Sequence, residues 1–167
     1  TVRATVEGAA SPAVFDLANV AGAPSLLVVT PSGTPQSTRV GTSFDQRLEV
    51  GVADELGNPV PGIEVHWMSP TDGPGASLSD DTTATGDDGA ASVHARASEV
   101  AGPYEVVAAV DGLEPVRFAL TNVAAEPATL GLWGGGSQSV AVGHTFPSAL
   151  GVALRDRFGN PIGGATI

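Results

Sequence analysis

The stretch LGNPVPG, residues 56–62, recurs as FGNPIGG at residues 158–164, and this repeated turn is the first indication of how the chain folds. Pro59 fixes its own φ and pushes Asn58 into an extended conformation. Gly57 has no Cβ and can therefore adopt a positive φ. These properties predict a stiff loop between two strands, which the chain uses twice.

The turn recurs because a larger unit recurs, with a period of about one hundred residues. Residues 40–65 match residues 142–167 at a spacing of 102, and residues 1–27 match residues 105–130 at a spacing of about 103. Self-similarity at a fixed period is the signature of a repeated structural unit. In the second match Phe15, Leu17, Asn19 and Pro24 fall on Phe118, Leu120, Asn122 and Pro127.

Apolar and polar residues alternate in short segments between these landmarks, as expected of strands with one buried face. No segment has helical periodicity. About seven strands in about 100 residues predict an all-β protein built from immunoglobulin-like β-sandwiches. The expected strands are residues 25–30, a short continuation at 37–40, then 47–54, 63–69, 91–98, 104–110 and 116–122.

The repeat divides the chain into three parts. Residues 24–124 should form a complete Ig-like sandwich, residues 1–23 the C-terminal strands of a preceding module, and residues 125–167 the N-terminal strands of a following one. A last segment of this length, ending at Ile167, cannot cover both faces of a sandwich. We therefore expect the chain to be part of a longer polypeptide, or another protein to add strands to the edge of this segment.

Two aromatic residues sharpen the fold assignment. Trp67 lies on the third long strand, where such sandwiches bury a Trp, and Tyr104 begins the sixth, where a tyrosine corner would return its hydroxyl to nearby backbone. Val106 stands where an antibody domain has its second Cys. Since the sequence contains no Cys, packing rather than a disulfide must close the core.

Charge and composition argue against several classes of function. The chain carries 18 acidic and 7 basic residues, a net charge of −11, so its surface repels nucleic-acid phosphates and anionic lipid headgroups. The lack of Cys removes thiolate nucleophiles and Cys-based zinc sites. No apolar run approaches the roughly 20 residues that cross a bilayer. We expect no nucleic-acid partner and no direct membrane insertion.

Five motifs follow one another in the expected sandwich: VGTSF (40–44), DELGNPVPGIEV (54–65), TGDDGAASV (85–93), GPYEVVA (102–108) and FALTN (118–122). With these motifs the chain resembles the bacterial immunoglobulin-like repeats of invasin- and intimin-type surface proteins. The resemblance implies tandem arrays on bacterial surfaces or in secreted proteins, which serve as stalks, spacers and adhesive modules, and it brings no catalytic residues with it.

The acidic run SDDTTATGDDG, residues 79–89, is the best candidate for a metal site. Carboxylates of Asp80, Asp81, Asp87 and Asp88 could supply oxygen ligands to calcium. Their spacing is not that of a dedicated calcium loop such as the EF-hand. We therefore favour a polar loop whose Asp-Asp-Gly forms the turn into the next strand, and we assign no metal ligand.

Other motifs carry weaker signals for chemistry. His66 and His94 fall on outward positions of separate strands, and no Glu or His stands at metal-ligand spacing from them or from His144. We interpret them as exposed histidines rather than as ligands or catalytic bases. The Gly-Gly-Gly at 134–136 lacks the Lys and the helix of a phosphate loop and is expected to form a flexible turn.

A carbohydrate site would need exposed aromatic faces. Trp67, Tyr104, Phe118 and Phe15 occupy expected core positions, which leaves Trp133 near the end of a first strand. We favour packing of Trp133 between modules or against a partner. Core filling and a sugar-binding platform are the alternatives.

The sequence thus predicts a non-enzymatic structural or adhesive module in an extracytoplasmic bacterial protein, at the cell surface or in the periplasm. Few residues separate consecutive modules, with Pro24 or Pro127 among them, so the joints should restrict bending. The expected partners are neighbouring Ig-like modules and another protein or complex, with no cofactor. The alternative is an accessory subunit docked through protein contacts on a larger assembly, including a membrane-bound one.

Overall fold

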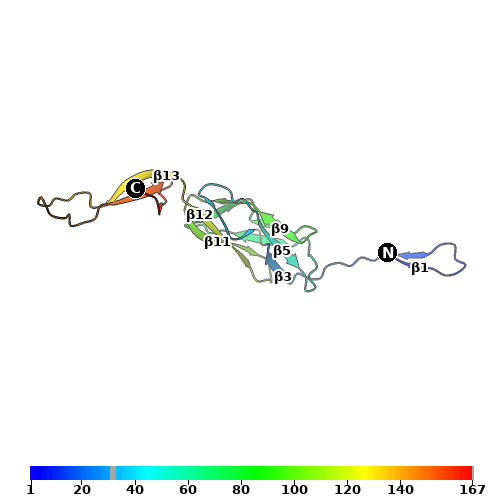
Figure 1. Ribbon diagram of the computed structural model, residues 1–167. Helices are drawn as coiled ribbons and strands as arrows, with labels where there is room; N and C mark the ends of the chain where they lie inside the picture. The colour runs from blue at the N-terminus through cyan, green and yellow to red at the C-terminus, as the bar shows by residue number, and fades with distance from the viewer. Residues whose placement is uncertain (31–32, 167) are drawn as a thin grey trace.

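The chain folds into β-strands joined by turns (Figure 1), which confirms the all-β prediction. The computed structural model describes residues 1–30 and 33–166. A central sandwich lies between two hairpins, one near each end of the chain, in an elongated arrangement (Figure 1). None of the described residues belongs to a helix that is long and apolar enough to cross a membrane.

The central sandwich contains two main sheets and a short two-stranded ladder. All pairs are antiparallel except β4 with β12, which run parallel. One sheet has the order β3 (Leu26–Val29), β5 (Leu48–Ala53) and β9 (Ala90–Val93); the other has the order β4 (Gln36–Arg39), β12 (Val116–Val123), β11 (Gly102–Ala109), β6 (Glu64–Met68) and β8 (Thr82–Ala84); β7 (Ala76–Leu78) pairs with β10 (Ala95–Ala97).

Each strand expected between residues 25 and 122 is present, within one or two residues of its predicted bounds, except that residues 91–98 divide into β9 and β10. Two strands, β7 and β8, were not expected. Both are three residues long, and β8 has the sequence Thr-Thr-Ala, so neither offers the apolar alternation that marks a longer strand. The prediction that residues 79–89 form only a loop is therefore wrong at β8.

The core lies between the two main sheets. Alternate residues of β5 point into it, and Leu48, Val50 and Val52 are at most 2% exposed. Trp67 is buried as predicted, with its ring centroid 5.9 Å from that of Phe118. Its indole N–H donates a hydrogen bond to Thr83 Oγ1 at 2.8 Å, so the polar atom of this large side chain is satisfied as well.

The hydrogen bond predicted from the Tyr104 hydroxyl to nearby backbone, as in a tyrosine corner, is absent among the described residues, so this prediction is wrong. Tyr104 pairs with Leu120 inside the β11–β12 ladder, where the surrounding backbone groups bond to each other. Its hydroxyl is buried and has no hydrogen-bond partner among the described residues, and burial raises its pKa to about 12. Asn122, which is 1% exposed, contacts the backbone here instead: its Nδ2 donates to the carbonyls of Gly75 and Val100 at 2.9 and 3.1 Å.

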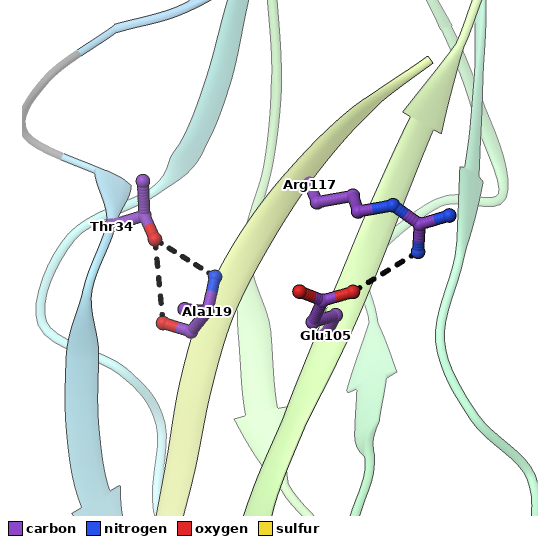
Figure 2. A network of polar contacts seen from close by, with 4 residues as sticks. All are labelled: Thr34, Glu105, Arg117 and Ala119. Atoms are coloured by element: carbon purple, nitrogen blue, oxygen red, sulfur yellow. Dashed lines mark hydrogen bonds and ion pairs between the residues drawn. The ribbon is translucent and has the colours of Figure 1, made fainter.

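Polar contacts join three neighbouring strands of the five-stranded sheet, β4, β12 and β11 (Figure 2). Thr34 Oγ1, just before β4, accepts a hydrogen bond from the Ala119 amide at 2.8 Å and donates to the Ala119 carbonyl at 3.4 Å. Arg117 of β12 contacts Glu105 of β11 at 3.0 Å. Both charged side chains are largely exposed, so this ion pair stabilises the sheet little, whereas Thr34 helps to hold β4 against β12.

Each terminal hairpin consists of two strands, β1 (Val2–Ala4) with β2 (Ala13–Phe15) and β13 (Pro127–Gly134) with β14 (Gly151–Asp156). All residues of β1, β2 and β13 are exposed. Phe15 is 51% exposed, so its predicted core position is wrong here, because β1 is the only strand beside β2 among the described residues. Ile167, where the predicted partial module stops, lies outside those residues.

Candidate functional site

The repeated turn holds the carboxylate of an Asp at its centre. After β5, Asp54 Oδ1 accepts hydrogen bonds from the Leu56 and Asn58 amides at 3.0 and 2.9 Å. The Asn58 side-chain amide donates to the same carboxylate, at 3.2 Å to Oδ1 and 3.0 Å to Oδ2. Gly57 adopts the positive φ that the turn requires, 82°. Asp54 is therefore the residue that closes the turn.

Asp54 also binds the linker that precedes the central sandwich. Its Oδ2 accepts a hydrogen bond from the Gly22 amide at 2.8 Å, across 32 residues of sequence. This bond and those from Asn58 and Leu56 stabilise the charged carboxylate and lower the pKa of Asp54 from 3.8 to about 2, against the opposing effect of burial. The turn and the linker are thus fastened together by one side chain.

The second copy of the turn repeats this geometry on the linker that follows the sandwich. Asp156 Oδ2 accepts from the Ala125 amide at 2.9 Å, and Oδ1 accepts from the Phe158 and Asn160 amides, both at 2.9 Å. Burial raises the pKa of Asp156, but the donors, with the Asn160 side chain first, outweigh it and hold this pKa at about 2. We call each set an Asp–Asn clasp: 54–58 with Gly22, and 156–160 with Ala125.

The second clasp also reaches the central sandwich. Asn160 Nδ2 donates to the Glu99 carbonyl at 2.8 Å, and its Oδ1 accepts from the Ala101 amide at 2.9 Å. Asn160 is only 8% exposed as a result. An exposed ion pair between Arg39 and Glu126 also spans this joint. The joint between the sandwich and the C-terminal hairpin is therefore held by specific polar contacts rather than by an extended linker alone.

Sequence reasoning identified the turn as a stiff loop but missed its role in binding the linkers. The available signal was the Asp that precedes Gly-Asn-Pro in both copies, Asp54 and Asp156, at matching spacing. The linkers contribute only the backbone amides of Gly22 and Ala125. Nearly every residue has such an amide, so the residue types of the linkers do not indicate the contact. This is why the contact could not be inferred from the sequence.

The structure separates the acidic residues of the run 79–89. Asp80 and Asp81 precede β8, whereas Asp87 and Asp88 follow it. Asp88 Oδ1 accepts a hydrogen bond from the Ala90 amide at 3.0 Å, which is the expected turn into β9. No group of three His, Cys, Asp or Glu side chains within residues 1–30 and 33–166 is arranged to hold a metal ion.

The histidines lie apart from one another. His66 is half-buried on β6, with Nδ1 3.2 Å from Thr82 Oγ1, so the full exposure predicted for it is wrong. His94 and His144 are exposed. The Gly-Gly-Gly segment ends β13, and Gly135 has a φ of 71°. The histidines, the Gly-Gly-Gly segment and the acidic run 79–89 were the candidates for catalysis or metal binding. The described structure does not assemble them into one site.

Trp133 is 82% exposed, so the core-filling alternative is wrong for this chain. The side chain lies over Gly151 of the paired strand, where an added Cβ would meet the indole ring at 3.2 Å. Packing against another module and a sugar platform remain predictions for Trp133.

Comparison with known proteins finds one family model that matches the chain. The family model for the bacterial Ig-like domain (group 1) matches residues 45–129, about half of the chain. No curated protein matches the chain.

Several solved structures are similar. The Escherichia coli adhesin FdeC is 21% identical over 87% of this chain and 46% of that one, with a TM-score of 0.52, which supports the fold. Domains 4 and 5 of the S-layer protein SbsC are 18% identical over 61% of this chain and 53% of that one, with a TM-score of 0.48. Invasin, a bacterial integrin-binding protein, is 22% identical over 83% and 27%, with a TM-score of 0.47. The chain spans about half the length of the FdeC and SbsC structures.

Proposed function

Because the chain belongs to the bacterial Ig-like domain family (group 1), we propose that it is a non-enzymatic structural module of an extracytoplasmic bacterial protein. Its role is that of a stalk, spacer or protein-interaction module. The observation that carries this proposal is the pair of Asp–Asn clasps, which fasten both linkers of the central sandwich. A module whose two linkers are fastened in this way restrains the orientation of its neighbours.

We propose the module boundaries 1–23, 24–124 and 125–167, and matching hydrogen bonds support them. Gln36 Nε2 donates to the Gly33 carbonyl at 2.8 Å, and Gln138 does the same to Gly135 at 3.0 Å. In each copy the Gln Oε1 also accepts a hydrogen bond from the backbone amide ten residues later, that of Gln46 for Gln36 and that of Ser148 for Gln138. The turns repeat their backbone bonds as well, at a spacing of 102 residues. These matches support the assignment of residues 125–166 to the opening strands of a module.

Successive modules of this kind form a semi-rigid rod. Each adds on the order of 35 to 45 Å, if its strands rise about 3.3 Å per residue and its loops add the rest. The short linkers and the clasps restrict bending between neighbours. The rod holds something away from a surface, or presents a sheet face or loop tip to a partner.

Single-molecule FRET tests the stiffness of the joint, and the absence of native Cys makes specific labelling simple. Dyes are attached to Asp87→Cys on the sandwich and Ser137→Cys on the C-terminal hairpin, both exposed positions. We expect a single narrow distance distribution. Asp156→Ala should broaden it, because the Ala125 amide loses its acceptor.

Asp111→Ala is the matched control, since it removes an exposed Asp from the β11–β12 turn, at the other end of these two strands from the joint. It should leave the distribution narrow. A broad distribution in the unsubstituted chain would contradict the semi-rigid spacer, whatever the clasp variant does.

Cellular location has a separate test. An antibody raised against residues 1–167 should label intact cells of the source bacterium, or cells whose outer barrier alone has been opened. Labelling only after lysis of the cytoplasm would contradict an extracytoplasmic module.

A second candidate function is favoured by exposed apolar side chains of the C-terminal hairpin. Leu132, Trp133 and Leu150 are 79%, 82% and 82% exposed. In this alternative the chain is an accessory subunit, and another protein supplies the strands that cover these side chains. Native size analysis separates the two: a stable complex with a distinct protein favours the subunit, and a long repetitive polypeptide favours the rod.

A further inference from the structure

The two Asp–Asn clasps differ in what their Asn side chains contact. Asn160 is buried, because both of its polar groups bond to the backbone of residues 99–101 in the central sandwich. Phe158, two residues earlier, is half-buried, and an added Cβ on Gly41 would lie 3.8 Å from its ring. The clasp at 156–160 therefore contacts a neighbouring module, the central sandwich, through the side of Asn160 that faces away from Asp156.

The clasp at 54–58 has the same internal bonds but an open outer side. Asn58 is exposed, and its Oδ1 accepts no hydrogen bond from any described residue. Leu56, the counterpart of Phe158, is 87% exposed. Beside them lies an open depression of about 650 Å³, lined by linker residues 18–21 together with Leu56, Asn58 and Pro59. We call these residues the open clasp surface.

We propose that the open clasp surface docks the β10–β11 connection of another Ig-like module, a segment with the backbone geometry of residues 99–101. Asn58 then donates to one carbonyl and accepts from one amide of that segment, as Asn160 does. This proposal rests on the proposed tandem arrangement. It adds which segment of the neighbouring module makes the contact, and that the Asn58 side chain binds it.

The internal repeat argues for this occupant. Val2 pairs with Phe15 as Val106 pairs with Phe118, so β1 and β2 correspond to β11 and β12. A module whose last strands are β1 and β2 would carry its own β10–β11 connection just ahead of Val2. By the symmetry of the second joint, this connection meets Asn58.

The chemistry of the Asn side chain fits the same occupant. An Asn amide presents one acceptor and one pair of donors, and so can pair with a backbone N–H and a backbone C=O at once. An Asp carboxylate could only accept, and would leave the carbonyl opposite it without a donor. The segment is recognised through its backbone, so modules of different sequence can dock.

The test uses the full chain extended at its N-terminus: a second copy of residues 24–105 is joined directly to Val2, which completes the first module. Amide hydrogen exchange is followed by NMR at the Ala101 amide of the added copy. We expect Asn58→Ala to speed exchange at this amide about fivefold to tenfold, the usual effect of losing one hydrogen bond.

Two variants calibrate the experiment. Asn160→Ala should produce a similar change at the original Ala101 amide, which already bonds to Asn160. Glu55→Ala, an exposed neighbour on the same turn, should change neither amide.

The outcomes separate this inference from the proposed function. Free exchange throughout the added copy would mean that it does not fold, which overturns the tandem arrangement and the docking inference together. A folded added copy whose Ala101 amide is insensitive to Asn58→Ala overturns the docking inference alone.

Discussion

At the residue scale, Trp67 is a large buried side chain of the core and tests the sandwich most directly. It is 3% exposed, packs beside Phe118, and bonds to Thr83 through its indole N–H. Trp67→Ala should lower the free energy of unfolding by about 3 to 5 kcal/mol, as measured by urea denaturation. Trp133→Ala makes the same chemical change at an 82% exposed site and should alter it by only about 0.5 kcal/mol. Equal effects of the two variants would remove Trp67 from the core.

The clasp carboxylates, also at the residue scale, make stability depend on pH. The pKa of Asp54 and that of Asp156 are each about 2 in the folded chain, against an ordinary value of 3.8. A depressed pKa adds stability that is fully present above the unfolded value and is lost as pH falls through the folded one. The melting temperature should therefore fall between about pH 4 and pH 2.

Asp54→Asn checks the source of this acid sensitivity by calorimetry from pH 7 to pH 2. The variant should melt lower at neutral pH, because the neutral amide accepts the Gly22 and Asn58 hydrogen bonds less well. Its melting temperature should then fall less in acid. Parallel curves for the variant and the unsubstituted chain would show that Asp54 contributes nothing to the pH dependence.

At the element scale, the turn into β9 packs against the repeated turn, and Gly89 is the point of closest approach. Gly89 is buried with a φ of 71°, and an added Cβ would lie 2.7 Å from the Val52 carbonyl oxygen and 2.8 Å from Pro59 Cβ. Gly89→Ala should therefore destabilise the sandwich through both strain and steric overlap. Gly57→Ala, at a φ of 82° with no atom within 4 Å of the added Cβ, isolates the strain, about 1 to 2 kcal/mol.

Urea denaturation of the two glycine variants gives the comparison. We expect Gly89→Ala to lose clearly more free energy of unfolding than Gly57→Ala. Equal losses would mean that β5, Pro59 and the β9 turn are not packed as closely as described.

At the scale of the whole molecule, the central sandwich should be far more stable than the hairpins beside it. A two-stranded hairpin is marginal in water, and every residue of β13 is exposed. Hydrogen exchange of residues 1–167 at low concentration should therefore protect amides within 25–123 strongly and those of 128–166 only weakly, because a hairpin that the clasp holds at the joint still opens often. Strong protection throughout, in a chain shown to be monomeric, would overturn the proposal that the last segment is an unfinished module.

The sequence alone determined the fold class, most strands and the core positions of the central sandwich. Period-two alternation decides which side chains face inward, and Leu48, Val50, Val65 and Trp67 lie where that pattern places them. The repeat of Gly-Asn-Pro marked both joints. These features depend on neighbouring residues or on a regular spacing along the chain, so the order of residue types is enough to predict them.

Tertiary structure decided the rest. Tyr104 lacks the hydrogen bond expected of it because the backbone around it is already paired in the β11–β12 ladder. The clasps depend on backbone amides of Gly22 and Ala125, and the bonds of Asn160 to residues 99–101 depend on how two segments meet across 59 to 61 residues. Backbone donors and acceptors are the same in nearly every residue, so only the folded chain shows which of them the Asp and Asn side chains reach.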